Sequence, residues 1–399
     1  MSAKIKNMDN TQHTTASVQA DNLSKTDSPR DLDLKWIVSP TPHQHCGSTT
    51  RSMMLDVLIA LLPALVWAVI QFGSRALLLT AWSCACCLLF EFGYEVILHK
   101  PITITDLSAL VTGVLLAYNL PVSMPLWITA IGAFFAIVVV KQLFGGIGKN
   151  VVNPALAARV FLMLAWPDAM GNVSDVGNGL LAQAIDGVAY ATPMTQMKAQ
   201  NISDIQILDL FFGREGGCIG EVSVALLMLG GIYLLLRRVI TWHTPAAFLG
   251  TVAVLTFLFP QISAMDRTDY MLAQLCGGGL MLGAIYMATD YTTSPVTANG
   301  RFWYGVGCGA ITIFIRFFGA YPEGVSFAIL IMNTLVWYLD RACKPVRFGG
   351  KQDKKRQNKQ NISPASAAEI PSEHKQTQRA PKEEQVEQKN GSIPSDAIE

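Results

Sequence analysis

The sequence predicts an all-α, polytopic membrane protein, and three observations support this prediction. The mean hydropathy is +0.34. Of the 399 residues, 51% are hydrophobic and only 15% are charged, whereas soluble domains carry about 25% charged residues. Uncharged runs such as 57–70 and 126–140 approach the roughly 20 apolar residues that cross the hydrocarbon core of a bilayer. The net charge of +1, with no basic stripe between the two ends of the chain, argues against nucleic-acid binding.

The spans are expected between two polar ends. Residues 1–48 and 346–399 are rich in Ser, Thr, Asn, Gln and charged residues, a composition typical of disordered tails. Between these ends, ten apolar segments have roughly the length and composition of membrane spans. They are residues 53–71, 76–97, 104–120, 124–143, 151–166, 221–237, 242–259, 269–288, 301–319 and 322–339.

Basic residues in the short connections predict the orientation of these spans, because Lys and Arg are retained on the cytoplasmic side. Arg51 precedes the first span, Lys100 follows the second, and Arg341 and Lys344 follow the last. Both ends of the chain are therefore expected in the cytoplasm. The long polar connection at 167–220 then faces outward, away from the cytoplasm.

This long connection divides the expected spans into five and five, and an odd number per half makes the second half inverted relative to the first. The expected organisation is a five-helix repeat at 49–166, the outer loop at 167–220 and a second repeat at 221–345. The segment LVTGVLLAYNLP (110–121) resembles LCGGGLMLGAIYMATD (275–290), and each is third in its half. Inverted repeats commonly place a binding site or an ion path where the halves meet.

The segment FGGIGKNVVNPALAARVF (144–161) opens the fifth expected span. It does not match the phosphate-binding loop, in which Ser or Thr follows the lysine, because Asn150 follows Lys149. Pro154 falls in the first helical turn, where proline is tolerated. The segment is either a glycine-rich turn or a helix start whose free N–H groups suit an anionic or carbonyl ligand.

Charged residues within the spans are candidates for function, since burying a charge in a bilayer is costly. Arg159 either pairs with a carboxylate such as Asp106 or Glu91, or faces a cofactor pocket. Glu91 and Glu95 stand four residues apart on one helix face, where like charges are unfavourable. They either lie in the interfacial layer or handle cations or protons. Asp106 suits the dipole at the start of the third span and is a candidate for the same ion path.

The segment ATDYTTSPVTANGR (288–301) follows the eighth expected span. It is either a polar, unwound stretch that lines a cavity or a loop in which Pro295 stops the helix.

Little in the sequence indicates a metal or hydrolytic site. Cys84 and Cys87 form a CxxC spacing inside an apolar run, and no second ligand pair follows, so no metal site is expected within this chain. No Ser, Cys or Thr stands at a spacing that pairs it with a His and an acid. We therefore assign no catalytic residue.

Five pieces of the chain, taken together, resemble the RnfD (RsxD) subunit of the Rnf electron-transport complex, which is related to the NqrB subunit of the sodium-pumping NADH:quinone reductase. The resemblance runs in family order across residues 37–345 and implies a helical fold similar to urea and ammonium channels. The pieces are SPTPH (39–43), TDLSALVTGVLLAYNLP (105–121), FGGIGKNVVNPALAARVF (144–161), DGVAYATP (186–193) and MATDYTTSP (287–295).

The resemblance also implies FMN bound through a phosphoester bond to a threonine. The family pattern is an Asp, two variable residues, Ser or Thr, a small residue and then Ala-Thr. Matched to this sequence, Asp186 is the leading acid, Ala191 the alanine and Thr192 the threonine that carries the flavin. The sequence departs from the pattern at Ala189 and Tyr190.

In this family a flavin transferase attaches the FMN outside the cytoplasmic membrane, which agrees with the outward placement of 167–220. The resemblance implies a location in the bacterial inner membrane, surrounded by lipid and by other membrane and peripheral subunits of the complex. It also suggests a second, noncovalent flavin (riboflavin). The expected role is relay of electrons in a complex that links ferredoxin and NAD to ion movement, and not a stand-alone enzyme.

Two other functions stay open. A channel or secondary transporter without a redox cofactor would suit the inverted repeat, the glycine-rich helices and the polar breaks equally well. A scaffold subunit that has lost its flavin is the third interpretation, because of the two departures from the family pattern. The segment 186–192 separates these functions, since a channel has no need of it. Thr195 carries another nearby hydroxyl but lacks the Ala-Thr context.

Overall fold

The computed structural model describes residues 49–171, 192–199, 206–213, 216–221, 223–262, 265–319, 321 and 323–344. The chain divides into a unit of residues 1–343 and a unit of residues 344–399, and the described residues lie in the first unit except for Lys344. Within the described residues every regular element is a helix, as the composition predicts. The two ends expected to be disordered fall outside them.

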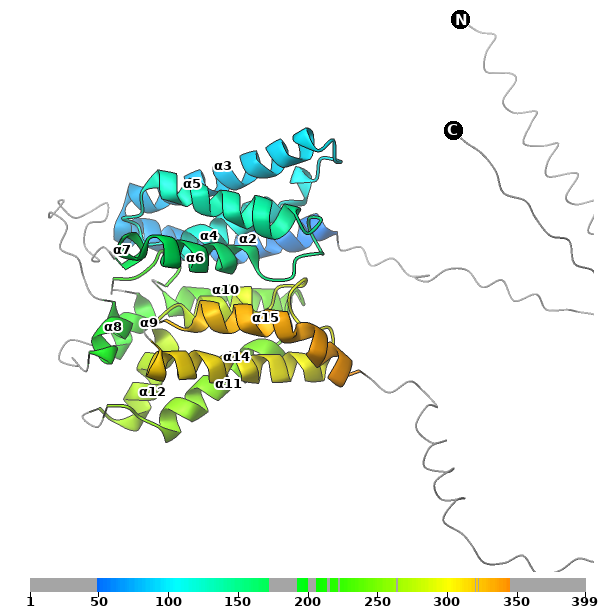
Figure 1. Cartoon of the computed structure of the whole chain (residues 1–399). Helices are drawn as coiled ribbons and strands as arrows, with labels where there is room; N and C mark the ends of the chain where they lie inside the picture. Colours follow the sequence, from blue (N-terminus) through cyan, green and yellow to red (C-terminus); the bar gives the residue numbers. More distant parts are fainter. Residues whose placement is uncertain are drawn as a thin grey trace, which may run out of the picture. The chain divides into compact units, whose positions relative to one another are not determined.

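The first group of helices follows residues 50–171 (Figure 1). Its two long helices meet at Gly73, whose φ of 77° is readily adopted only by glycine. The elements are α2 (Thr50–Phe72), α3 (Ser74–Ile97), η1 (Ile104–Asp106), α4 (Ser108–Tyr118), α5 (Leu126–Phe134), the π-helix η2 (Phe135–Gln142), α6 (Pro154–Ala165) and α7 (Pro167–Gly171).

The second group contains the remaining described elements (Figure 1). Two short helices, α8 and α9, precede the longer ones. The elements are α8 (Pro193–Lys198), α9 (Ile207–Phe212), α10 (Val224–Leu236), α11 (His243–Leu258), α12 (Arg267–Cys276), α13 (Leu280–Leu282), the π-helix η3 (Gly283–Met287), α14 (Ala298–Phe318) and α15 (Val325–Ala342).

Three of these helices, α2, α3 and α15, are long and apolar enough to cross a membrane. The pair formed by α12 and residues 280–287 is bent by 63° and makes a fourth span if it is counted as one. The shorter apolar helices are α4, α5 together with η2, α6, α10 and α11. The helices are those of a polytopic membrane protein, and the number of ten spans stays a prediction.

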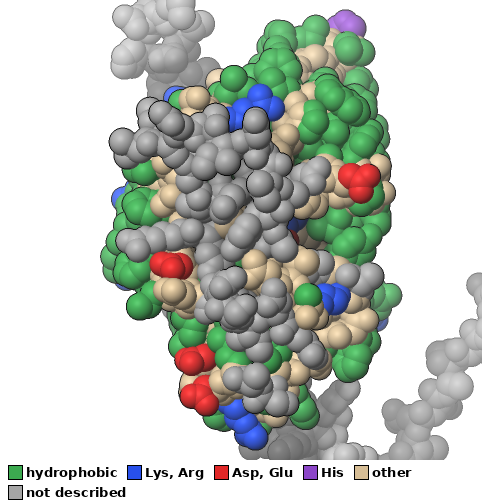
Figure 2. Space-filling model, turned by 90° about the vertical axis from the view of Figure 1, so that its left-hand side faces the viewer, with side chains coloured by type: hydrophobic (Ala, Val, Ile, Leu, Met, Phe, Trp, Pro, Cys, Tyr) green, Lys and Arg blue, Asp and Glu red, His purple; other side chains and the backbone are tan. Residues whose placement is uncertain are grey.

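Large apolar side chains remain exposed along the flanks of the bundle. Leu62, Val66, Leu229, Phe314 and Trp337 are among them. Figure 2 looks onto the end of the bundle that carries α8 and shows hydrophobic side chains along its sides. Exposed apolar surface of this extent calls for an apolar environment, which the acyl chains of a bilayer supply.

The start of α6 follows the expectation from its sequence. Asn153 is the N-cap, and its side-chain oxygen accepts hydrogen bonds from the backbone N–H groups of Ala155 (3.1 Å) and Leu156 (3.4 Å). Pro154 occupies the first turn, where its missing N–H is not needed. Asn153 and Pro154 therefore define where this helix begins.

The third segment of each half is broken. In the first half, Leu107 adopts a φ of 61° between η1 and α4, a conformation uncommon for residues other than glycine. In the second half, α12 ends at Cys276, and Gly278 and Gly279 adopt φ of 67° and 63°. A Cβ at Gly279 would lie 2.8 Å from Oε1 of Glu221. Both the backbone conformation and the adjacent carboxylate therefore require glycine at this break.

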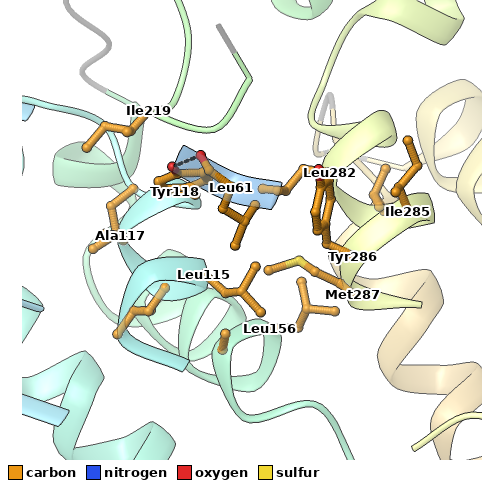
Figure 3. Close-up of a cluster of buried hydrophobic side chains, with 14 of the residues drawn as sticks. Leu61, Leu115, Ala117, Tyr118, Leu156, Ile219, Leu282, Ile285, Tyr286 and Met287 are labelled. Carbon is orange, nitrogen blue, oxygen red and sulfur yellow. Dashed lines mark hydrogen bonds between the residues drawn. The ribbon is translucent and has the colours of Figure 1, made fainter. Parts of the chain in front are cut away.

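A continuous apolar core joins the two groups of helices. Figure 3 shows side chains of α2, α4 and α6 meeting those of α13 and η3. Two buried tyrosines satisfy their hydroxyls within it: Tyr118 donates to the carbonyl of Leu61 (2.7 Å) and Tyr286 to that of Leu227 (3.0 Å). Because hydroxyls buried without a partner are costly, these bonds fix the helices to one another.

The ends of the bundle are distinct. Figure 1 shows the start of α2 and the end of α15 at one end and α7, α8, α9 and α12 at the other. Near the first of these ends, Asp56 of α2 accepts hydrogen bonds from the Tyr233 hydroxyl (3.0 Å) and from Arg237 (3.2 Å), the two residues lying in and just after α10. Thr192, at the start of α8, lies at the opposite end.

Candidate functional site

Thr192 is held in a defined position as the N-cap of α8. Its Oγ1 accepts a hydrogen bond from the backbone N–H of Thr195 (3.3 Å) and lies 2.8 Å from Oγ1 of Thr195. Pro193 follows in the first turn, and the Thr192 side chain is half-buried. Asp186 and Ala191, the other residues of the predicted attachment pattern, lie outside the described residues, as do Ala189 and Tyr190.

Helix α8 packs directly on the break between α12 and α13. Met194 and Met197 are buried in a cluster with Tyr270, and a Cβ at Gly277 would come within 2.8 Å of the Met194 sulfur. At the other end of α8, the Lys198 ammonium donates to the carbonyl oxygen of Gly319. The helix that begins at Thr192 is therefore fixed over the glycine-rich break.

Arg159 of α6 belongs to a buried cluster of charges on the other side of this break. One of its terminal nitrogens donates to Asn119 Oδ1 (2.7 Å). The other lies 3.4 Å from Oε1 of Glu221 and forms an ion pair with Glu323. Both acids belong to the second half of the chain, so this arginine connects the two groups of helices.

Arg159 therefore pairs with carboxylates, as one of the two interpretations expected, but its partners are not the suggested Asp106 or Glu91. Glu91 is instead paired with Lys141, and the acids that Arg159 contacts come from the segment before α10 and the residue two positions before α15. These acids are 62 and 164 residues away in the sequence, beyond the reach of helical spacing rules.

Arg316 of α14 is the second buried arginine of the cluster. It donates to the backbone oxygen of Gln274 (2.6 Å), to the side-chain oxygen of Gln274 (2.9 Å) and to the backbone oxygen of Gly277 (2.9 Å). Those bonds tie α14 to the end of α12. The Nε atom of Arg316 is buried and has no partner among the described residues.

The acid Glu221 lies in the connection before α10 and is half-buried among these groups, with its side chain 9% exposed. Burial, together with the nearby Glu323 carboxylate, raises its pKa to about 7, while Arg159 opposes both effects. Its carboxyl can therefore gain or lose a proton near neutral pH. Glu221 also lines a cavity of about 30 Å³ together with Pro193 and Gly278, next to Thr192.

A larger cavity, of about 200 Å³, lies under α8. Its lining combines apolar side chains with polar groups, a mixture common in cofactor and ligand sites. The lining residues are Met194, Met197, Lys198, Gln261, Ile262, Tyr270, Gln274, Arg316 and Phe317.

A separate cavity of about 90 Å³ lies between the two groups of helices. It is lined by both motifs that the sequence analysis left open, through Asn150, Asn153 and Pro154 on one side and Asp290 and Thr292 on the other. The Oδ1 atom of Asn150 is buried without a partner among the described residues. Burial raises the pKa of Asp290, while bonds from two threonine hydroxyls oppose this. The cavity-lining interpretation of the segment 288–301 is therefore confirmed geometrically. At the start of α6, the N–H groups of Ala155 and Leu156 are bonded to Asn153 and are not free for a ligand.

Lys141, which also lines this cavity, neutralises one of the two glutamates predicted to share a face. Its ammonium lies 2.6 Å from Glu91 Oε1 and 2.7 Å from Ser108 Oγ. Glu95 accepts a bond from the backbone N–H of Thr103 (3.1 Å). Both glutamates are buried, so they do not lie on a solvated interfacial surface, and a part in ion movement stays a prediction.

Comparison with known proteins identifies the family. The profile described as "NQR2, RnfD, RnfE family" matches residues 37–349. The chain belongs to this family. The resemblance to RnfD indicated by the five sequence pieces is thus confirmed.

Curated relatives in this family cover most of the chain. The D component of the Na(+)-translocating ferredoxin:NAD(+) oxidoreductase complex of Acetobacterium woodii is 44% identical over 326 residues, which make up 81% of this chain and 98% of the relative. The D component of the proton-translocating ferredoxin:NAD(+) oxidoreductase complex of Clostridium ljungdahlii is 38% identical, over 79% of this chain and 97% of the relative. The D component of the ion-translocating oxidoreductase complex of Stutzerimonas stutzeri is 38% identical, over 76% and 93% respectively.

Four charged residues of these sites were not predicted from the sequence, namely Glu221, Glu323, Arg316 and Lys141. Arg316 and Lys141 each lie inside an expected span, and the cost of a charge at that depth was a usable signal. Glu221 and Glu323 lie at the starts of expected spans, where an acid is ordinary. For these two only the three-dimensional structure provides the signal.

Proposed function

We propose that this chain is the membrane subunit of an ion-translocating ferredoxin:NAD oxidoreductase complex and that it relays electrons through FMN attached to Thr192 by a phosphoester bond. The subunit role is supported by relatives that are named as the D component of such complexes and that match this chain over nearly their whole length. The attachment is supported by the position of Thr192, a half-buried hydroxyl at the start of a short helix beside two cavities.

The residues around Thr192 fit a flavin. The Nε atoms of Arg159 and Arg316 are buried polar atoms without partners in the described part of the chain. Bound FMN would supply the electron-transfer chemistry, as cofactors generally do. The protein's own part is to hold the attachment point over the helix break, to present the arginines, and to hold a proton on Glu221 near neutral pH.

A second, noncovalent flavin such as riboflavin is proposed for the cavity between the halves. The polar groups of Asn150, Asn153 and Thr292 line this cavity, and the unpartnered Oδ1 of Asn150 is suited to a hydroxyl or an imide N–H. Lys141 contributes a buried positive charge to the same lining. The other walls are largely apolar, as planar ring systems require.

We also propose the finer topology: ten spans in two inverted five-helix repeats, with both ends cytoplasmic, the connection 167–220 outside and a fold like that of urea and ammonium channels. The packing of α2 on α10 and of α6 on α15 supports the repeat, because these helices are first and last in their halves. The break in the third segment of each half supports it too. Lipid, the flavin transferase and the other subunits of the complex are the proposed partners in a bacterial inner membrane.

The experiment is direct. The chain is produced in a membrane with the flavin transferase present, denatured, separated on a gel and viewed under ultraviolet light. We expect a fluorescent band in the native chain and in Thr195→Ala, and none in Thr192→Ala. Absence of the band in the native chain, or a band that survives Thr192→Ala, contradicts the assignment and leaves the channel or transporter as the better interpretation.

A further inference from the structure

The cavity under α8 has a polar floor and apolar walls. Met194, Met197 and Phe317 provide apolar surface, and methionine sulfur packs favourably against aromatic rings. Tyr270, Gln274 and Arg316 provide the polar part of the lining. A planar ring with one hydrogen-bonding edge matches this division better than a compact polar ion does.

One N–H donor of Arg316 has no hydrogen-bond partner among the described residues. A guanidinium carries five N–H donors, and the terminal nitrogens here are committed to Gln274 and Gly277. The Nε–H is buried without a partner in the described chain, and an unmade bond of this kind costs about 1–3 kcal/mol. A hydrogen-bond acceptor placed beside this Nε–H would complete the set.

The groups that surround the charge of Arg316 differ from those that surround the charge of Arg159. Arg159 forms ion pairs with two glutamates, whereas the hydrogen-bond partners of Arg316 are neutral carbonyl oxygens. Glu221 and Glu323 are near enough to act on Arg316 electrostatically, yet neither forms a salt bridge with it within the described residues. Its positive charge is therefore available to a group in the cavity.

The attachment point adjoins this cavity. Thr192 precedes Met194 by two residues, and Met194, Met197 and Lys198 of the same helix line the cavity. The bond from Lys198 to Gly319 spans from α8 to the end of α14. A group attached to Thr192 therefore starts at the rim of the cavity that Arg316 lines.

We propose that this cavity receives the ring system of the flavin held on Thr192, and that Arg316 is the positioning residue whose cation faces the carbonyl edge of the ring and raises its reduction potential. This inference rests on the proposed attachment at Thr192. The physical reason is that reduction adds electron density to that edge, and a fixed positive charge beside it favours the reduced form.

The test measures the midpoint potential of the covalent flavin by spectroelectrochemistry in the purified complex, after gel fluorescence has shown that the flavin is attached. We expect Arg316→Gln to make the midpoint potential of the flavin more negative by at least about 30 mV. For a two-electron couple this shift equals a tenfold change in the equilibrium constant for reduction. Arg267→Gln is the matched control, because Arg267 carries the same charge on the exposed first turn of α12, and its midpoint should equal that of the native complex.

Because Arg316 also holds α12 to α14, its replacement could prevent folding. A second variant, Met197→Trp, fills the cavity without removing any of those bonds, and it should shift the midpoint in the same direction and make the flavin fluorescence more easily quenched by iodide. Attached flavin with a native midpoint and native quenching in Met197→Trp would overturn the inference while leaving the attachment intact. A complete lack of flavin on the native chain would overturn both.

Discussion

The buried pair of Lys141 and Glu91 gives the sharpest stability prediction. The two charged atoms are 2.6 Å apart, and both side chains are 2% exposed or less. At an effective dielectric constant of 20 their attraction is roughly 6 kcal/mol, which offsets the cost of taking both ions out of water. Removing one partner leaves that cost without the attraction, and such changes typically destabilise by about 3–5 kcal/mol.

We therefore expect Lys141→Met to lower the melting temperature of the detergent-solubilised protein on the order of 10 °C. The double variant Glu91→Gln with Lys141→Met should recover most of this loss, because no buried charge remains. Lys149→Met, which removes an exposed lysine, is the control and should melt as the native protein does. The measurement is loss of the monodisperse peak in size-exclusion chromatography after heating.

This explanation is refuted if Lys141→Met has the same melting temperature as the native protein, because the ion pair would then contribute nothing to stability. It is equally refuted if the double variant is no more stable than the single one. In that case the loss would come from the apolar stem of the lysine or from its bond to Ser108, and the charge would not be the cause.

Three further outcomes follow from the described contacts. Gly279→Ala should destabilise by roughly 1–2 kcal/mol from its left-handed backbone alone, and by more because its Cβ would meet Glu221; thermal melting measures this. Stability should fall as pH rises from about 4.5 to about 7, since the raised pKa of Glu221 favours its protonated form in the folded protein; Glu221→Gln should flatten the melting temperature across this window, and an unchanged slope would contradict it. Glu95→Gln and Asp106→Asn should each reduce ion uptake by the reconstituted complex; normal uptake in both would restrict these acids to a structural role.

The parts of the fold that depend on local chemistry could be predicted. Asn153 and Pro154 define the start of α6 because capping and proline geometry act within one turn. The break after α12 was not predicted, because residues 269–288 were expected to form one span, whereas Gly278 and Gly279 adopt the left-handed conformation within it. The π-helical winding of η2 was not predicted, and it is there that Lys141 and Gln142 both reach Glu91.

The site depends on contacts that no local pattern contains. Arg159 was identified as a costly buried charge, but its partners could not be, since Glu221 and Glu323 meet it only once the two halves have packed. Thr192 was identified by resemblance to family members. Its packing over the helix break follows from Met194 and Met197, which in sequence are ordinary apolar residues.

The hydrogen bonds between the halves have a mechanical consequence. At one end of the bundle Asp56 of the first half is bonded to Tyr233 and Arg237 of the second, and towards the other end Arg159 of the first half is bonded to Glu323 of the second. A rocking motion about the apolar core would open one end or the other, and opening the Arg159 pair would leave buried charges uncompensated at a cost of about 3–5 kcal/mol. These bonds therefore resist a rocking of one half against the other at both ends of the bundle.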